Sequence, residues 1–202
     1  MALSKIQAES MNLADTYTFT GTVSGASNLV LLEEDTTGAS DVAYADVTLS
    51  QSSDYDHQIL VVNGFYHNDT STGRDMSWFM IEGGSRINST GAYSNSRIGK
   101  KNGVSTNGSS DQSSTQIRLQ WYAIGNAANE PSDIYIKIFN SHSTSLRTTL
   151  HAEINGISDD GNNYTNYANS IRLATTVCEG LRMQASVGNL TYAQYRLFGV
   201  KA

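Results

Sequence analysis

Cysteine and proline are nearly absent from this chain of 202 residues. The single cysteine, Cys178, excludes an intrachain disulfide, and its place in an apolar run is typical of a small buried hydrophobe. The single proline, Pro131, excludes a proline-rich linker. The sequence also lacks the CxxC and Cys/His spacings of zinc sites.

Charged residues and long apolar runs are scarce as well. Only 16% of the residues are charged, against about 25% in an average protein, and the net charge of −6 offers no basic surface to nucleic acid. No apolar run approaches the ~18 residues of a membrane-spanning helix, and the N-terminus lacks the apolar segment of a signal peptide. We therefore expect a soluble protein made in a cytoplasm, with no nucleic-acid partner and no membrane insertion.

Serine, threonine, asparagine and glycine dominate instead, which favours a turn-rich β protein. The densest hydrophobic signal lies in residues 55–82, where residues 59–62 form an unbroken apolar run and residues 76–81 form another after a polar turn. Short runs rich in β-branched and aromatic residues predict strands that are buried on at least one face. This stretch therefore predicts two strands of a β core.

The rest of the chain repeats this pattern as about ten short strands, with no convincing helix and no internal repeat. Residues 42–49 and 116–123 alternate between apolar and polar side chains, as half-buried strands do. The pattern predicts an all-β fold, an antiparallel two-sheet sandwich of jelly-roll kind, over residues 28–202. In the first alternating segment the expected inner residues are Ala43, Ala45, Val47 and Leu49.

Residues 1–27 differ from the rest, because apolar residues are sparse there and the segment ends in Gly, Ser and Ala. Alone, it could not bury enough surface to offset the entropy lost on ordering. One interpretation is a frayed terminus; the other, which we favour, is an extended arm for attachment and oligomerisation that orders against another chain. The residues expected to make this attachment are Ser4, Lys5, Ile6, Met11, Leu13, Tyr17 and Phe19.

Two polar tracts, residues 99–114 and 159–169, have the composition of exposed loops. Aromatic side chains flanked by Asn, Asp and Ser could stack on sugar rings there, although we expect most exposed aromatics to pack in an interface or the core. For contact with a receptor or glycan we single out Tyr164, Tyr167, Asn102 and Asn107. The other aromatic residues considered are Trp78, Tyr93, Tyr122 and Tyr135.

The sequence shows no catalytic or metal-binding constellation. The four histidines, which share no HxH or HxxxH spacing, are His57, His67, His142 and His151. Residues 159–163 carry oxygen ligands that calcium prefers, but they lack EF-hand spacing and have the composition of an ordinary turn. Glu33 and Glu34 occupy adjacent strand positions, so their carboxylates point to opposite faces and cannot act as a glycosidase pair. We expect no enzyme activity, no cofactor and no metal.

Several segments resemble a β-sandwich module of bacteriophage virion proteins, which recurs at the ends of tail-fibre-like proteins, particularly from marine phages. They are residues 55–81, 123–130, 134–140 and 188–201, with a leader-like segment at residues 4–25. The resemblance implies a virion component, often homotrimeric, displayed on tail or head, and it supplies no catalytic residue. The chain departs from the family pattern because it has no long fibre shaft.

Two functions follow from this resemblance. The first is a short tail-fibre-like or receptor-binding protein, which attaches through its N-terminal arm and presents the sandwich to a host surface glycan or protein. The alternative is a capsid decoration or head-fibre protein that stabilises or ornaments the shell, and a glycan-degrading enzyme is the least favoured. The expected partners are other virion proteins and further copies of the chain, with a trimer favoured. The expected location is the virion, tail in preference to head, after synthesis in the host cytoplasm.

Overall fold

The computed structural model describes residues 28–68, 76–102, 104–120, 124–125, 127–158 and 160–201. Within these residues the chain forms fourteen strands and no helix, so none of the described segments is a helix that could cross a membrane. The predicted all-β fold is confirmed, whereas the expected arm, residues 1–27, lies outside the described residues. The strands are β1 (Leu29–Asp35), β2 (Ala39–Val42), β3 (Ala45–Thr48), β4 (Tyr55–His67), β5 (Met76–Glu82), β6 (Ser85–Arg86), β7 (Tyr93–Lys101), β8 (Val104–Ser114), β9 (Ser132–Phe139), β10 (Thr149–Ile157), β11 (Asn163–Arg172), β12 (Gly180–Ala185), β13 (Leu190–Tyr192) and β14 (Gln194–Lys201).

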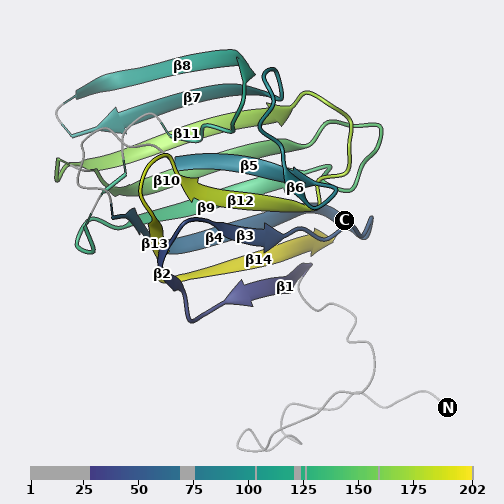
Figure 1. The fold of residues 1–202 in the computed structure, drawn as a ribbon, viewed down its shortest axis with the longest axis horizontal. Coiled ribbons are helices and arrows are strands. Elements are labelled where there is room, and N and C mark those ends of the chain that lie inside the picture. The colour runs from purple at the N-terminus through teal and green to yellow at the C-terminus, as the bar shows by residue number, and fades with distance from the viewer. Residues whose placement is uncertain are drawn as a thin grey trace, which may run out of the picture.

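The strands form two antiparallel sheets. The larger sheet has ten strands in the order β1-β14-β4-β9-β10-β11-β7-β8, with β13 and β2 attached beside β4, and the smaller sheet has the order β3-β12-β5-β6. Figure 1 shows β1 and β8 at opposite sides of the molecule, with β5, β12 and β3 lying across the middle of the larger sheet. The larger sheet therefore has an inner face, which the smaller sheet covers, and an outer face, which is turned away from it.

Side-chain alternation decides which residues face inward. In β9, Ile134, Ile136 and Ile138 are buried, while Tyr135 and Lys137 point to the outer face. This is the period of two that a strand imposes on a sheet with one covered face. The alternation expected for residues 134–138 is therefore confirmed.

The two strands of the densest hydrophobic stretch are both present, but they do not pair with each other. β4 lies between β14 and β9 in the larger sheet, whereas β5 lies between β12 and β6 in the smaller one. The chain thus crosses from one sheet to the other between residues 67 and 76. Each strand supplies one wall of the core, which explains why both are so apolar.

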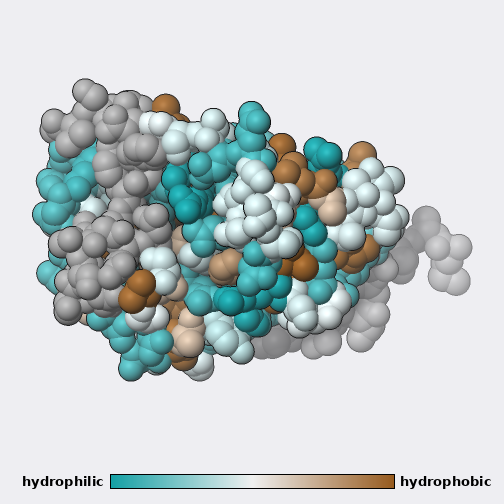
Figure 2. Space-filling model, turned by 45° about the horizontal axis from the view of Figure 1, so that its top comes forward, coloured by the Kyte–Doolittle hydropathy of each residue, from teal (hydrophilic) through white to brown (hydrophobic). Residues whose placement is uncertain are grey.

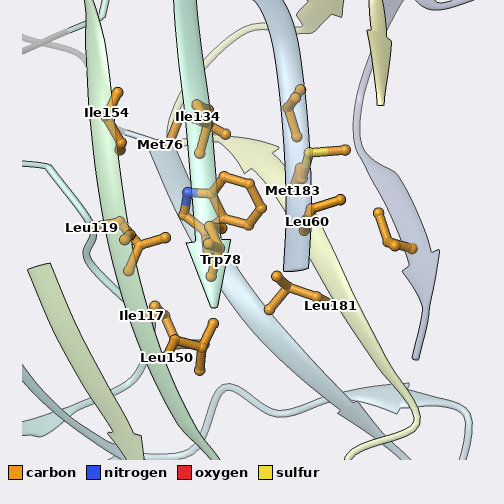
Figure 3. Close-up of a cluster of buried hydrophobic side chains, with 14 of the residues drawn as sticks. Leu60, Met76, Trp78, Ile117, Leu119, Ile134, Leu150, Ile154, Leu181 and Met183 are labelled. Carbon is orange, nitrogen blue, oxygen red and sulfur yellow. The ribbon is translucent and has the colours of Figure 1, made fainter. Parts of the chain in front are cut away.

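The core is the layer between the sheets. Figure 3 shows Trp78 of β5 among side chains from both layers, with Leu60 and Ile134 on the larger sheet and Met183 on β12. All four side chains have less than 2% of their surface exposed. Burial of this kind stabilises a fold by about 1.5–3 kcal/mol for each large apolar side chain.

Cys178 belongs to this core, as the sequence predicts. Its side chain is fully buried and its thiol lies 3.2 Å from the carbonyl oxygen of Gly180. Burial raises the pKa of the thiol to about 12. A thiol in this state is neutral at physiological pH and behaves as a small hydrophobe.

The polar tracts expected to be exposed loops are largely strands, so that prediction was wrong. Residues 99–114 contain the end of β7 and the whole of β8, which form an antiparallel hairpin. Residues 159–169 contain the first seven residues of β11, whose full span is Asn163–Arg172. The prediction relied on side-chain polarity, whereas backbone pairing holds these strands and β8 occupies a sheet edge.

Two predicted strands are shorter or more irregular than expected. Ala43, which lies between β2 and β3, is exposed, while Val47 and Leu49 are buried. Of the four residues expected to face inward, the prediction is therefore right for the last two and wrong for Ala43. Ala45 is half-buried and packs against the core. The break follows Asp41, whose φ of 60° is a left-handed conformation that interrupts an extended chain.

The segment from Gln116 to Gln120 forms one isolated bridge in place of a full strand. The Ile117 N–H donates to the Trp78 carbonyl at 2.8 Å, and the Trp78 N–H donates to the Ile117 carbonyl at 3.2 Å. Ile117 and Leu119 are fully buried, as the alternation predicts. Residues 121–123 lie outside the described residues.

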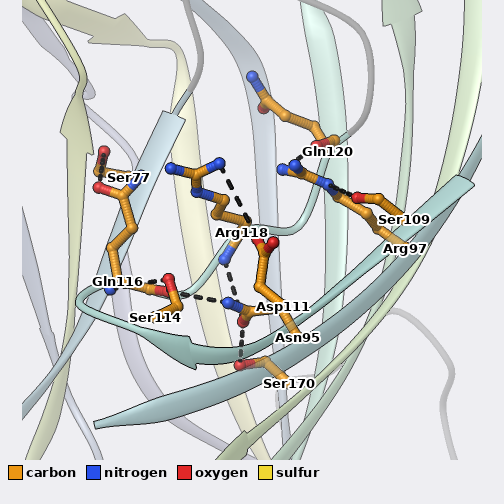
Figure 4. A network of polar contacts seen from close by, with 10 residues as sticks. All are labelled: Ser77, Asn95, Arg97, Ser109, Asp111, Ser114, Gln116, Arg118, Gln120 and Ser170. Atoms are coloured by element: carbon orange, nitrogen blue, oxygen red, sulfur yellow. Dashed lines mark hydrogen bonds and ion pairs between the residues drawn. The ribbon is translucent and has the colours of Figure 1, made fainter. Parts of the chain in front are cut away.

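Polar contacts also tie this segment to both sheets (Figure 4). The Asn95 amide of β7 donates to the Gln116 carbonyl at 3.0 Å, and its side-chain oxygen accepts from Ser170 of β11 at 2.7 Å. On the other side, the hydroxyl of Ser77 on β5 donates to the Gln116 side chain at 2.8 Å. These hydrogen bonds satisfy buried polar groups, which would otherwise destabilise the fold.

A second polar connection joins the sheets through Arg172 of β11 and Glu82 of β5. Arg172 donates from Nε to Oε1 at 2.7 Å and from Nη2 to Oε2 at 3.2 Å, and both side chains are nearly buried. Next to this pair, the Tyr93 hydroxyl of β7 accepts from the Met80 N–H and donates to the Ile87 carbonyl. The two sheets are thus fixed relative to each other by bidentate and hydroxyl contacts as well as by apolar packing.

We predict that Glu82→Ala and Arg172→Ala each lower the free energy of unfolding by about 3 kcal/mol, because each leaves an uncompensated charge in a nearly buried position. Urea unfolding of the single and double variants should give a double loss well below the sum of the single losses. The matched control is the exposed pair Glu34–Arg196, at 3.3 Å, whose removal should change stability by about 1 kcal/mol or less. Equal losses for the two pairs would contradict this prediction.

Candidate ligand-binding groove

The register of the larger sheet places outer-face side chains in rows that run across the strands. One row consists of Tyr135 on β9, Glu153 on β10, Tyr167 on β11 and Ile98 on β7, each directly opposite the next. Neighbouring strands are about 4.8 Å apart, so the backbones that carry the two tyrosines are separated by about 10 Å, with Glu153 between them. A single row therefore offers two aromatic rings on either side of a carboxylate.

A second row lies beside the first, two residues along each strand. It consists of Lys137 on β9, His151 on β10, Asn169 on β11 and Ser96 on β7. These side chains supply hydrogen-bond donors and acceptors next to the aromatic row. Glu153 keeps a local partner, because its Oε1 accepts a hydrogen bond from the Asn155 amide at 2.9 Å.

Between these rows the outer face is hollowed into a groove of about 760 Å³. This volume falls within the range of about 300–1,000 Å³ that is usual for small-ligand sites. The groove crosses five neighbouring strands, from β9 to β8. It is lined by Ser96, Arg97, Ile98, Gly108, Ser109, Ser110, Tyr135, Lys137, His151, Ala152, Glu153, Tyr167, Ala168 and Asn169.

Large apolar surfaces are exposed in this groove. Tyr167 is 53% exposed, Ile98 47% and Tyr135 37%. A tyrosine ring in this state presents an apolar face to a ligand while its hydroxyl stays available for hydrogen bonds. The groove can therefore hold a ligand that combines apolar patches with many hydroxyl or amide groups.

The outer face continues past the groove into an apolar half, on β4, β14 and β1. Leu31 pairs with Phe198 and Phe198 with Ile59, while Leu29 pairs with Val200. Leu29 and Leu31 are 44% and 47% exposed, and the others are half-buried. On the face of the molecule drawn in Figure 2, by contrast, hydrophobic side chains are scattered among hydrophilic ones. We call this set the apolar half: Leu29, Leu31, Ile59, Val61, Phe198 and Val200.

Of the four residues expected to contact a ligand, Tyr167 lines the groove. Tyr164 is 3% exposed, and its hydroxyl lies 2.6 Å from the Ser132 hydroxyl inside the protein, so its prediction as a surface contact was wrong. Burial raises the pKa of Tyr164 well above its ordinary value of 10. Asn102 lies in the turn between β7 and β8 and does not line the groove, and Asn107 lies on β8 opposite Gly99.

The wider set of aromatic residues divides in the same way. Trp78 and Tyr93 are fully buried between the sheets, so they contact no ligand. Tyr135 faces the groove. Tyr122 lies outside the described residues.

Sequence reasoning missed most of the groove. Lys137, His151, Glu153 and Asn169 come from three strands, and only the register brings them together. The one signal that could have found them is the period of two. Lys137 and Asn169 each lie two residues from an outer-facing tyrosine on the same strand, and Glu153 lies directly opposite both tyrosines. His151 lies two residues from Glu153 and therefore shares its face.

The acidic residues considered for catalysis do not converge. Glu33 turns toward the protein and accepts hydrogen bonds from the Tyr195 hydroxyl at 2.6 Å and the Thr48 N–H at 2.9 Å. Glu34 turns the other way, toward Arg196. This divergence is what adjacent positions on a strand predict.

In the segment considered for calcium binding, residues 159–163, the described part begins with a turn. Asp160 forms an ion pair with Lys101, and hydrogen bonds from Lys101 and Ser158 hold the pKa of this carboxyl far below its ordinary value of 3.8. Asp159 lies outside the described residues. Among the residues that the structure does describe, no three His, Cys, Asp or Glu side chains gather as a metal site would require.

No protein-family model matches the chain, and no curated protein matches it.

We predict that Tyr164→Phe lowers the free energy of unfolding by about 1 kcal/mol, because the buried Ser132 hydroxyl loses its partner. The matched control is Tyr167→Phe on the same strand, which removes an exposed hydroxyl and should change stability by less than about 0.5 kcal/mol. Both values can be measured by chemical unfolding. A loss for Tyr167→Phe as large as that for Tyr164→Phe would contradict the burial described above.

Proposed function

We propose that this chain is a structural protein of a bacteriophage virion, a short tail-fibre-like or receptor-binding component. The resemblance of residues 55–81, 134–140 and 188–201 to the virion sandwich module supports this proposal, and so does the all-β fold. The observation that carries the receptor-binding part is the groove on the outer face, with Tyr135 and Tyr167 exposed in it. The receptor is a glycan or protein of the host surface.

The proposal includes a jelly-roll arrangement of the sandwich. Support comes from the pairing of the first strands with the last, since β1 pairs with β14, β2 with β13 and β3 with β12. It also comes from the crossings between the sheets, for example from β4 to β5 and from β11 to β12. In folds of this kind, strands that are distant in the sequence become neighbours in wrapped hairpins.

Residues 1–27 are the attachment arm in this proposal, with Ile6, Leu13, Tyr17 and Phe19 supplying its few apolar contacts. Further copies of the chain associate into a trimer through the apolar half. Exposed apolar side chains that gather on one face of a protein often mark an interface. Closed symmetry would also protect the β1 edge from open-ended pairing.

We predict that deletion of residues 1–27 leaves the sandwich folded but abolishes incorporation into virions. Thermal unfolding of the purified variant checks the first half, and mass spectrometry of purified particles checks the second. Imaging of labelled full-length protein then separates the tail position from the alternative, a capsid decoration or head-fibre protein. Incorporation of the truncated chain would show that the sandwich itself is the anchor.

We predict that the double substitution Leu29→Ser and Leu31→Ser reduces the solution mass from that of a trimer toward the 21.9 kDa of one chain. The reason is that the two most exposed side chains of the apolar half would be lost from the proposed subunit contact. Light scattering after size exclusion gives the mass. The control is Leu146→Ser, which removes an equally exposed leucine, 56% exposed, from a loop. A monomeric unmodified chain would rule out this interface.

A further inference from the structure

We infer that the groove is a binding site for an uncharged oligosaccharide, with Tyr135 and Tyr167 as the two rings on which sugar units stack. This inference rests on the proposed receptor-binding function and names the class of ligand for it. The two tyrosines lie on the same row of the sheet and face the same way. Rings spaced by two strands, about 10 Å apart, suit a chain ligand better than one small ring.

Stacking accounts for the apolar part of the site. The exposed faces of Tyr135, Tyr167 and Ile98 would lose water when the C–H face of a sugar covers them. In the unliganded protein these side chains remain partly in water although they stand in a concave surface. A flat, purely apolar partner would leave the polar row beneath it without hydrogen bonds, which disfavours such a ligand.

The polar row accounts for recognition. A sugar hydroxyl both donates and accepts, and the groove offers both roles within reach of the rings: Lys137 donates, Glu153 accepts, and Asn169 does both. Ser96 and Ser110 extend this capacity along β7 and β8. The site therefore matches a ligand with many hydroxyl groups on either side of an apolar ring face.

The charges of the groove favour an uncharged ligand. Lys137 and Glu153 lie on neighbouring strands as diagonal neighbours, so their opposite charges offset each other. Arg97 also lines the groove, but it alternates with the outward-facing Ser96 and Ile98, so its guanidinium is directed to the inner side of the sheet. There its Nε donates to the Ser109 hydroxyl at 3.1 Å and its Nη1 to the Gln120 carbonyl at 2.9 Å. Glu153 stands between the two tyrosines, so a carboxylate on a sugar unit that spans them would meet like-charge repulsion.

The test uses the full chain on an array that carries neutral hexose and N-acetylhexosamine oligosaccharides beside uronate- and sialate-containing ones. The strongest ligand is then titrated by calorimetry against three variants. Tyr135→Ala and Tyr167→Ala should each weaken binding about tenfold or more, which corresponds to about 1.4 kcal/mol. The matched control is Tyr44→Ala, which removes a tyrosine of similar exposure, 49%, that lies over Arg182 of the smaller sheet and should leave the affinity unchanged.

Three results would overturn the inference: no binding to any neutral glycan, preference for the acidic glycans, or an equal loss in the Tyr44→Ala control. If the groove is instead covered by a second copy of the chain, Tyr135→Ala and Tyr167→Ala would lower the oligomeric mass. That outcome also overturns the inference. The proposed virion role is tested separately, by the presence of the chain in purified particles. A chain that is absent from particles could still bind a neutral glycan, and a virion protein could bind no glycan.

Discussion

The structure depends on the covering of one face of the ten-stranded sheet by the four-stranded sheet, which is smaller. Ten strands pair into the larger sheet, and only four, helped by residues 116–120, lie over its inner face. Trp78 is the point at which these parts meet, because its side chain fills the layer and its backbone bridges to Ile117. Two consequences follow from this arrangement. Packing fixes the inner residues, while the outer face stays accessible to other molecules.

The side chains on the outer face change in character from one edge of the larger sheet to the other. On β1, β14 and β4 it carries aliphatic side chains beside the Glu34–Arg196 ion pair, whereas from β9 to β8 it mixes tyrosines with charged and amide side chains. The ring of Phe139 marks the boundary, since it stacks on His57 at 5.1 Å and contacts His151 at 5.3 Å. One continuous sheet can therefore join copies of the chain at one end and present a ligand site at the other.

The sequence was sufficient for the fold class and for much of the core. Strict alternation predicts the strand that contains Ile134, Ile136 and Ile138, and all three side chains are buried in the structure. It was insufficient for β8 and β11, whose polar residues carry no apolar signal and whose pairing depends on neighbours distant in the sequence. The same reason explains Tyr164: its flanking residues are polar, yet the pleat turns its side chain inward, toward Ser132. Register, which sets the groove, is a property of the assembled sheet and not of any one segment.

The pairing of β1 with β14 also governs how the chain can fold. β14 is the strand that pairs with β1, so β1 has no neighbour in the larger sheet until residues 194–201 have been synthesised. Contacts this distant in sequence make folding slow, on the order of milliseconds to seconds, because loop closure precedes any gain from pairing. Until residues 194–201 are present, a nascent chain would leave the apolar residues of β1 unpaired, whereas β4 can pair with β9 once residues 132–139 are present. Polar strands such as β8 and the abundance of serine and asparagine then help to keep the unfinished chain from aggregating.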